Sequence, residues 1–118
     1  MATRLKTLVK SRSIAFERQE GRCCYCDYPM WRDAVERFAH IHKITVKQAS
    51  KLRCTAEHLT ARQDGGKDTA SNIAAACVTC NLRRHRRAFV PEPEAYRALV
   101  QARISRRKWH SLGVLGTA

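Results

Sequence analysis

Apolar residues recur at helical spacing near both ends of the chain. Between residues 3 and 20 they return at near-helical intervals until Gly21, which predicts a helix that ends there. Residues 94–109, which follow Pro91 and Pro93, repeat this spacing and predict a second helix whose last turns are basic. A helix is therefore expected near each end of the chain.

The middle of the chain predicts two short helices inside residues 31–52. An amphipathic stripe predicts the first of them, with apolar positions at Trp31, Ala34, Val35, Phe38 and Ala39. Thr45, followed three residues later by Gln48, has the pattern of a capping box and predicts a second helix that runs through Leu52.

A strand, a turn and a short helix are predicted after Leu52. Residues 53–60 alternate weakly between apolar and polar, which favours a strand, and the Asp-Gly-Gly sequence at 64–66 indicates a turn. Ser71 or Asn72 can then cap the start of a short helix over residues 73–76.

The composition provides only a small apolar core. The 118 residues favour one domain, in which Leu, Ile, Val and Phe together number 23 while Ala alone numbers 16. The N-terminal segment lacks the apolar stretch of a secretory signal, and no apolar run approaches the roughly 20 residues of a membrane span. We therefore expect a cytoplasmic protein whose six cysteines serve metal binding rather than disulfides.

Charge is distributed unevenly along the chain, whose formal net charge is +13. The net charges of successive segments are +4 for residues 1–22, +3 for 23–54, −1 for 55–82 and +7 for 83–118. Basic flanks suit a polyanion such as nucleic acid, although a basic surface without a dedicated ligand is the alternative. A bound cation would explain why acidic groups gather in the middle.

Two pairs of cysteines have a metal-ligand spacing: Cys23 with Cys26, and Cys77 with Cys80. Two residues between the members of each pair allow four thiolates to converge on one tetrahedral structural zinc ion, whereas redox activity of one pair is the competing use. Structural zinc contributes on the order of 10 kcal/mol to folding in small modules. Cys24 and Cys54 are expected to be small buried residues, with an exchange of Cys24 for Cys23 left open.

The 50 residues between the two pairs contain a specific series of motifs: Glu57-His58, then Asp64-Gly65-Gly66, then Ser71-Asn72-Ile73, with Asn81 directly after the second pair. In this order they resemble the HNH endonuclease family, and the resemblance covers about residues 14–87. It implies an α+β fold with a small zinc-stapled ββα-metal core, in which a strand, a turn, a strand and a helix hold a metal ion between them, with flanking and inserted helices.

The resemblance also implies roles for individual residues. His58 matches the general base that takes a proton from the attacking water, and Asn72 matches the asparagine that orients this histidine and holds the loop. Glu57 and Asn81 match ligands of a catalytic divalent ion, although the family more often has Asp or His at the position of Glu57. Carboxylate and amide oxygens favour Mg²⁺ or Mn²⁺, which keep water molecules as further ligands.

Basic side chains close to these motifs are candidates for contact with phosphates. They are Arg62, Arg83, Arg84, His85, Arg86 and Arg87. The run at 83–87 directly follows the last motif, which favours phosphate contact over the alternative of a solvated charge run.

These inferences predict one domain over residues 1–118. It comprises an N-terminal helical arm (1–22), an HNH zinc core (23–87, with inserted helices at 31–52) and a basic C-terminal helix (91–110). The predicted function is metal-dependent hydrolysis of DNA phosphodiester bonds, with a structural zinc and a catalytic Mg²⁺ or Mn²⁺, and with no membrane partner and no small-molecule substrate. A non-catalytic zinc-stapled DNA-binding module is the main alternative, and a protein that presents its inserted helix to a protein partner is another.

Overall fold

The computed structural model describes the backbone of residues 2–112 and the side chains of residues 5–112. In chain order the elements are α1 (Ala2–Arg18), α2 (Val35–His42), α3 (Val46–Ser50), β1 (Cys54–His58), a short 3₁₀ helix η1 (Arg62–Asp64), β2 (Ile73–Cys77), α4 (Val78–His85) and α5 (Pro93–Ser105). No helix within the described residues combines the length and the apolar character that would span a membrane.

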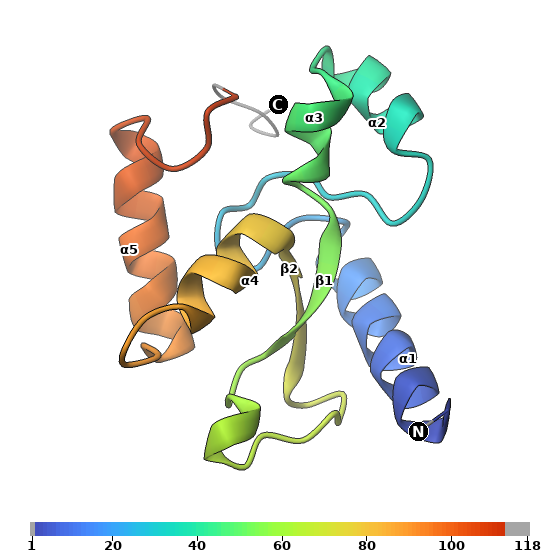
Figure 1. The fold of residues 1–118 in the computed structure, drawn as a ribbon, viewed down its shortest axis with the longest axis vertical. Helices are drawn as coiled ribbons and strands as arrows, with labels where there is room; N and C mark the ends of the chain where they lie inside the picture. The colour runs from blue at the N-terminus through green and yellow to red at the C-terminus, as the bar shows by residue number, and fades with distance from the viewer. Residues whose placement is uncertain (1, 113–118) are drawn as a thin grey trace.

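A hairpin of β1 and β2 lies at the centre of the molecule (Figure 1). The strands are antiparallel, and their register places Cys54 opposite Cys77 and His58 opposite Ile73. Helix α1 packs against one side of this hairpin and α4 against the other. The order strand, strand, helix is therefore the ββα arrangement that the family resemblance implies, and α2 and α3 are inserted before β1.

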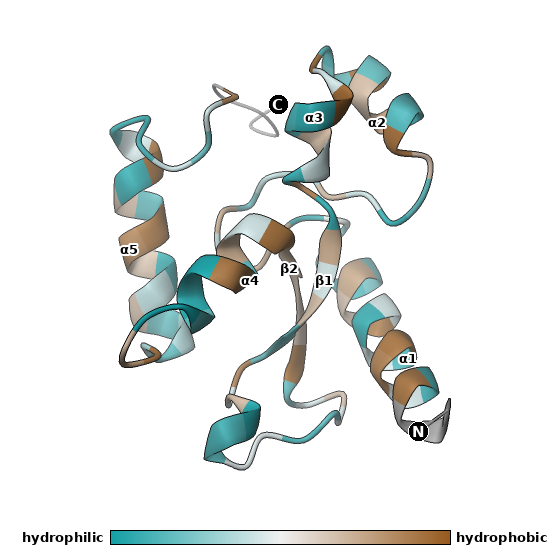
Figure 2. Cartoon of the chain, in the orientation of Figure 1, coloured by the Kyte–Doolittle hydropathy of each residue, from teal (hydrophilic) through white to brown (hydrophobic). Residues whose placement is uncertain are grey.

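The helix predicted over residues 73–76 is wrong, because these residues form β2. Every residue of this strand is buried, since helices cover it on both sides, and the hydrophobic colour of β2 is visible in Figure 2. A strand buried on both faces shows no alternation, and over so few residues periodicity cannot distinguish it from a buried helix. The helix begins only at Val78, where the Cys77 side chain accepts a bond from the Cys80 N–H.

The remaining helices confirm the predicted pattern with shifted ends. The capping box of Thr45 and Gln48 is present at the start of α3. Helix α2 begins four residues after Trp31, because Ala34 has a left-handed conformation with φ 53°, and Trp31 instead pairs with Arg53 beside β1. Helix α5 ends at Ser105, before the predicted end at 109.

The N–H groups on the open edge of β2 all have acceptors. They are Ile73 N to Thr69 O at 3.1 Å, Ala75 N to Gln19 Oε1 at 3.0 Å, and Cys77 N to Cys23 Sγ at 3.3 Å. The Gln19 amide also donates to Ala75 O at 2.8 Å, so one side chain occupies both groups of that residue as a neighbouring strand would.

The open edge of β1 is occupied at one N–H and two carbonyl groups. The Cys54 N–H donates to Trp31 O at 2.9 Å, whereas the carbonyls of Ala56 and His58 accept from side chains of α4. The donors are Asn81 Nδ2 to Ala56 O at 3.0 Å and Arg84 Nη1 to His58 O at 2.9 Å. Polar side chains of α4 therefore hold it against β1.

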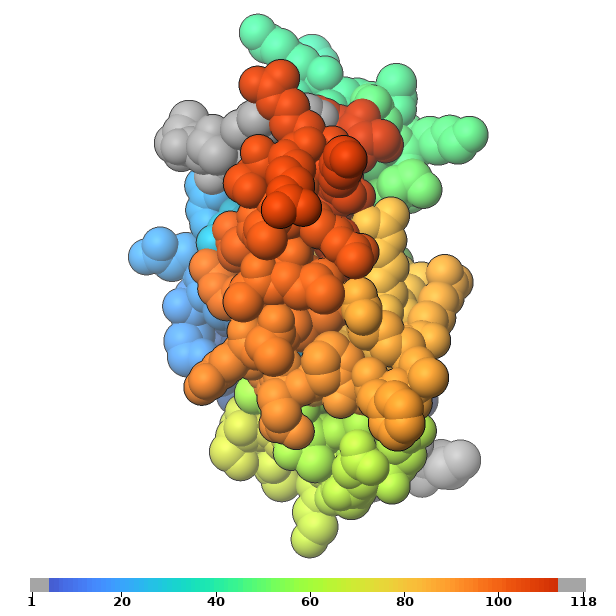
Figure 3. All heavy atoms as spheres, turned by 90° about the vertical axis from the view of Figure 1, so that its left-hand side faces the viewer, coloured from blue at the N-terminus to red at the C-terminus, as the bar shows by residue number. Residues whose placement is uncertain are grey.

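Helix α5 covers one face of the molecule, beside α4 and the loop between the strands (Figure 3). Its buried Tyr96 meets the Tyr25 ring edge-on at 4.8 Å between centroids, and its hydroxyl donates to Cys80 O at 2.7 Å. Arg97 donates to Cys24 O at 2.9 Å and binds Asp27. These contacts attach α5 to the segment that contains the first cysteine pair.

Candidate functional site

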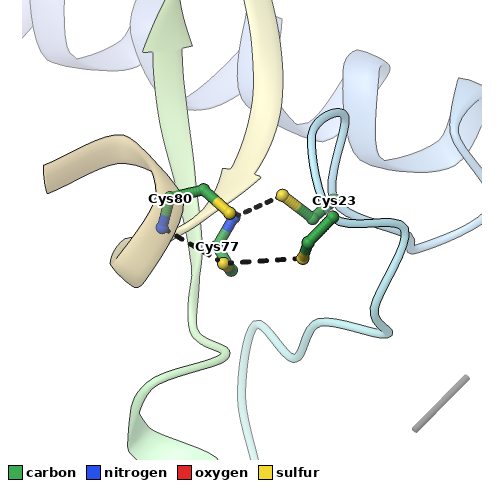
Figure 4. Close-up of side chains that lie close together, drawn as sticks. Cys23, Cys77 and Cys80 are labelled. Carbon is green, nitrogen blue, oxygen red and sulfur yellow. Dashed lines mark hydrogen bonds between the residues drawn. The ribbon is translucent and has the colours of Figure 1, made fainter. Parts of the chain in front are cut away.

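The two cysteine pairs form one buried cluster. Its members are Cys23, Cys26, Cys77 and Cys80, and their sulfur atoms all lie within 4.8 Å of one another. The first pair lies in the loop after α1 and the second at the junction of β2 and α4 (Figure 4). A tetrahedral zinc site with Zn–S bonds of about 2.3 Å places its sulfurs roughly 3.8 Å apart, and the Cys26 and Cys77 sulfurs are 3.9 Å apart.

The donors around the cluster also fit a bound metal. Each sulfur accepts at least one N–H: Cys23 Sγ from Tyr25 N (3.4 Å) and Cys77 N (3.3 Å), Cys26 Sγ from Tyr28 N (3.5 Å), Cys77 Sγ from Cys80 N (3.4 Å), and Cys80 Sγ from the Trp109 indole (3.3 Å). Such donors stabilise thiolates, the form that binds zinc. Four thiolates would complete a closed structural site with no position for a substrate, so the cluster fits a zinc ion that stabilises the fold.

Cys24 and Cys54 lie outside this cluster. Cys54 is buried on β1, where burial raises the pKa of its thiol to about 11, and Cys24 is half-buried. The cluster therefore uses Cys23 and not Cys24.

A second site lies where the end of β1 faces α4. A pocket of about 420 Å³ is lined by Glu57, His58, Ala61, Arg62, Gln63, Asn81, His85 and Val90. Glu57 and His58 end β1, and the register of the hairpin brings them beside the helix that follows β2. Asn81 and His85 are four residues apart and so project from the same side of α4. The structure thus brings together three of the four residues predicted for catalysis and the divalent ion.

Glu57 is completely buried, with 0% of its surface exposed. Its Oε2 accepts from the Tyr25 hydroxyl at 2.8 Å and from Arg84 Nη1 at 3.2 Å. Its Oε1 lies 2.7 Å from His85 Nε2. Burial raises the pKa of the Tyr25 phenol, which therefore stays protonated and donates to the carboxylate. These contacts fix one oxygen of Glu57 and direct the other towards His85.

Arg84 is not a surface residue, and its predicted contact with phosphate requires correction. Only 2% of its surface is exposed. Besides Glu57, its guanidinium donates to three main-chain carbonyls: His58 O at 2.9 Å, Leu59 O at 2.9 Å and Pro91 O at 2.8 and 3.0 Å. All of its nitrogens are therefore used within the protein, and Arg84 joins β1, α4 and the segment before α5.

The amide nitrogen of Asn81 is hydrogen-bonded within the protein, whereas its oxygen is available. Its Nδ2 donates to Thr55 Oγ1 and Ala56 O, both at 3.0 Å. These bonds fix the amide, and no described residue donates to its Oδ1. Because Asn81 lines the pocket, this carbonyl oxygen is of the type that could bind a cation there.

His58 has a partner that the sequence analysis did not identify. Its Nε2 lies 2.7 Å from Asp68 Oδ1, and both side chains are largely buried. Arg62 Nη2 donates to both oxygens of the same carboxylate, at 3.0 and 3.1 Å. The hydrogen bonds with His58 and then with Arg62 lower the pKa of Asp68. Its separation from His58 by ten residues follows no spacing rule, so only the folded loop shows the pair.

Asn72 holds the loop and does not touch the His58 side chain. Its Oδ1 accepts from Thr60 N at 2.8 Å, and its Nδ2 donates to Thr60 O at 3.1 Å and Lys67 O at 2.9 Å. The resemblance implies that Asn72 both holds the loop and orients His58. Its contacts with the loop are direct, whereas any effect on the His58 side chain passes through Thr60 and Leu59.

A basic groove lies on the opposite side of α4 from the pocket. It measures about 240 Å³ and is lined by Arg83, Arg86, Arg87, Arg103 and Trp109. The guanidinium of Arg83 lies 4.6 Å from the centre of the Trp109 ring. Arg86, Arg87 and Arg103 are exposed, and no carboxylate of the described residues forms an ion pair with them. Hydrophilic residues dominate the C-terminal end of α4 in Figure 2.

Comparison with protein-family models identifies the family of the chain. The model of the HNH endonuclease family matches residues 23–87, which is more than half of the chain. The chain therefore belongs to the HNH endonuclease family. No curated protein and no solved structure matches it.

Proposed function

We propose that this chain is a metal-dependent endonuclease that hydrolyses phosphodiester bonds in DNA. Family membership supports nuclease activity, and the pocket between β1 and α4 supports the chemistry. The single observation that carries the proposal is the composition of that pocket. An imidazole with a carboxylate partner, His58, stands beside a separate group of oxygen and nitrogen donors for a cation.

The residues of the second group fit a divalent ion. Glu57 supplies a carboxylate oxygen, Asn81 an amide oxygen and His85 an imidazole nitrogen. His85 is therefore better assigned to the cation than to a phosphate, as its 2.7 Å contact with Glu57 directs it into the pocket. The two oxygen donors suit Mg²⁺ or Mn²⁺. Such an ion would neutralise the charge that develops on the phosphate oxygens during hydrolysis.

His58 is the general base of the proposed reaction. It would take a proton from the water that attacks phosphorus, a contribution of about 10² to 10⁴ in rate. Arg62 lines the same pocket, and its Nη1, for which the described residues offer no acceptor, remains for a phosphate oxygen. Asn72 keeps the loop that carries both Arg62 and Asp68 closed.

The arginines of the basic groove are proposed to bind the DNA backbone. Arg83, Arg86 and Arg87 lie on the other side of the same helix as Asn81 and His85. An α-helix is about 10–12 Å across, so phosphates held there belong to a part of the substrate away from the cut bond. Each neutralised phosphate releases counterions and makes binding dependent on salt.

A plasmid assay tests the proposal. The purified chain, with zinc bound, is incubated with supercoiled plasmid and Mg²⁺ or Mn²⁺, with and without chelator. We expect nicking that needs the added ion. His58→Ala should lower its rate at least about 100-fold while DNA affinity stays within about twofold. His40→Ala is the matched control, because His40 is an exposed histidine on α2 far along the chain from the pocket.

Two results would contradict the proposal. Cleavage by His58→Ala at the rate of the unaltered protein would exclude His58 as the base. Binding of DNA without nicking under any divalent ion would instead favour a non-catalytic zinc-stapled DNA-binding module.

A further inference from the structure

The loop between η1 and β2 presents one carboxylate to the proposed general base. Asp68 Oδ1 lies 2.7 Å from His58 Nε2, a separation typical of a charge-assisted hydrogen bond. The exposed fractions of the two side chains are 14% for His58 and 13% for Asp68, so little water competes for this contact. A carboxylate accepts but does not donate, so the imidazole must carry its proton on Nε2.

We infer that Asp68 is a positioning residue that orients the His58 ring and fixes its tautomer, so that Nδ1 is the atom that accepts a proton. This inference rests on the proposed function, in which His58 is the base. With Nε2–H donated to Asp68, the only lone pair of the neutral imidazole is on Nδ1.

A second contact of Nε2 would require the opposite tautomer, and distances decide between them. Arg62 Nε lies 3.4 Å from His58 Nε2 and could donate to it only if that nitrogen carried no proton. The contact with Asp68 is shorter by about 0.7 Å and joins a charged acceptor, so it is the stronger of the two. Arg62 instead holds Asp68 itself, with Nη2 bonded to both carboxylate oxygens.

The backbone that carries Asp68 is held from several directions. Ser11 of α1 donates to Asp68 O at 3.1 Å, and Asn72 donates to Lys67 O at 2.9 Å. Gly66 passes so close to Thr60 that a Cβ there would lie 1.7 Å from Thr60 O. These contacts therefore fix the backbone of the loop at Asp68 and just before it in the chain. The carboxylate is already in position when the reaction begins.

In the proposed step an O–H bond of water breaks as the new P–O bond forms, and the proton moves to Nδ1 of His58. The bond from phosphorus to the leaving oxygen then breaks, and that oxygen takes a proton from solvent. Asp68 takes no proton in this sequence. It stabilises the positive imidazolium through the hydrogen bond that it already makes.

Single-turnover cleavage measures the contribution of Asp68. We expect Asp68→Asn to lower the cleavage rate about 10- to 1,000-fold, with DNA affinity and zinc content within about twofold of the unaltered protein. Asp68→Ala should be less impaired than Asp68→Asn, because the Asn amide can donate to Nε2 and place the proton on Nδ1. Asp64→Asn is the control, since Asp64 is exposed on η1 in the same loop.

If Asp68 had only a structural role, the order of the cleavage rates of these two variants would be reversed. Such a role would make Asp68→Ala, which removes more of the side chain, the more damaging of the two changes. Addition of Asp68→Asn to His58→Ala should have no further effect on the rate, because a positioning residue acts only through the residue that it positions.

The tautomer can also be observed without cleavage. In a ¹⁵N-histidine spectrum at pH 7.5, we expect His58 to carry its proton on Nε2 in the unaltered protein and to lose this preference in Asp68→Ala. A proton on Nδ1 in the unaltered protein, or cleavage by Asp68→Asn within twofold of normal, would overturn the inference. A lack of cleavage by the unaltered protein would contradict the nuclease proposal instead, and the spectrum would still decide the role of Asp68.

Discussion

Replacement of Arg84 should destabilise the protein more than replacement of any other arginine in the basic run. Arg84→Met removes the guanidinium and keeps an unbranched chain in its place. The change leaves Glu57 buried without its cationic partner, and it leaves the carbonyls of His58, Leu59 and Pro91 without this donor.

The magnitude follows from these contacts. Removal of one partner of a buried ion pair costs about 3–5 kcal/mol, and a buried carbonyl left without a donor costs about 1–3 kcal/mol. Glu57 keeps its bonds to Tyr25 and His85, and water can reach part of the site, so these costs do not add fully. We expect a loss of about 4 kcal/mol, a large share of the 5–15 kcal/mol that stabilises a typical domain.

Urea unfolding followed by circular dichroism, with zinc present, measures this loss. With a slope of about 1.5–2 kcal/mol/M, the midpoint should fall by roughly 2–3 M. Arg86→Met is the matched control, because Arg86 is exposed two residues further along, and it should change stability by less than about 0.5 kcal/mol. A loss below about 1 kcal/mol for Arg84→Met would refute the structural role and return Arg84 to the candidate phosphate contacts.

Three further predictions concern zinc, acid and salt. Cys80→Ala should lose the stoichiometric zinc that the unaltered chain binds, whereas Cys54→Ala, a buried cysteine outside the cluster, should keep it in a zinc-release assay. Burial lowers the pKa of His110 to about 4 from about 6.5, so the unfolded chain binds this proton more tightly and stability falls as pH drops through that range. Urea unfolding at pH 7 and pH 5 should therefore show an acid loss about 2 kcal/mol larger for the unaltered chain than for His110→Leu, and equal losses would contradict the buried neutral histidine. Arg86→Ala with Arg87→Ala should reduce the slope of log affinity for DNA against log salt by about 2 at unchanged stability, and an unchanged slope would remove the basic groove from the DNA interface.

Metal-ligand pairs and helix caps were predictable from the sequence, because the spacing of a few neighbouring residues determines them. The two-residue gaps of the cysteine pairs predicted one cluster, and the Thr45 capping box predicted the start of α3. Both depend on neighbours within a few residues. The strand at Ile73–Cys77 was missed because burial on both faces removes the alternation that identifies strands.

The burial of Arg84 was missed because a run of basic residues resembles a solvated surface. A signal was present, since Arg84 follows the buried Cys80 by four residues and so shares its side of a helix. This signal depends on a helix that begins at Val78, whereas the residue pattern favoured a helix over residues 73–76, one element earlier. The pair of His58 and Asp68 depends on the closed loop between the strands, which no pattern of residue types reveals.

The occupied edges of the hairpin restrict how two copies of this chain could associate. A two-stranded sheet normally offers unpaired main-chain groups to which a strand of another molecule can add. Here Gln19, Cys23 and Thr69 engage one edge, and Trp31 with two side chains of α4 engages the other. Continuation of the sheet from one molecule into the next would break contacts that hold the pocket and the loop with the first cysteine pair. A pair of copies acting on both strands of a duplex would therefore meet through surfaces other than the hairpin edges, or through the DNA itself.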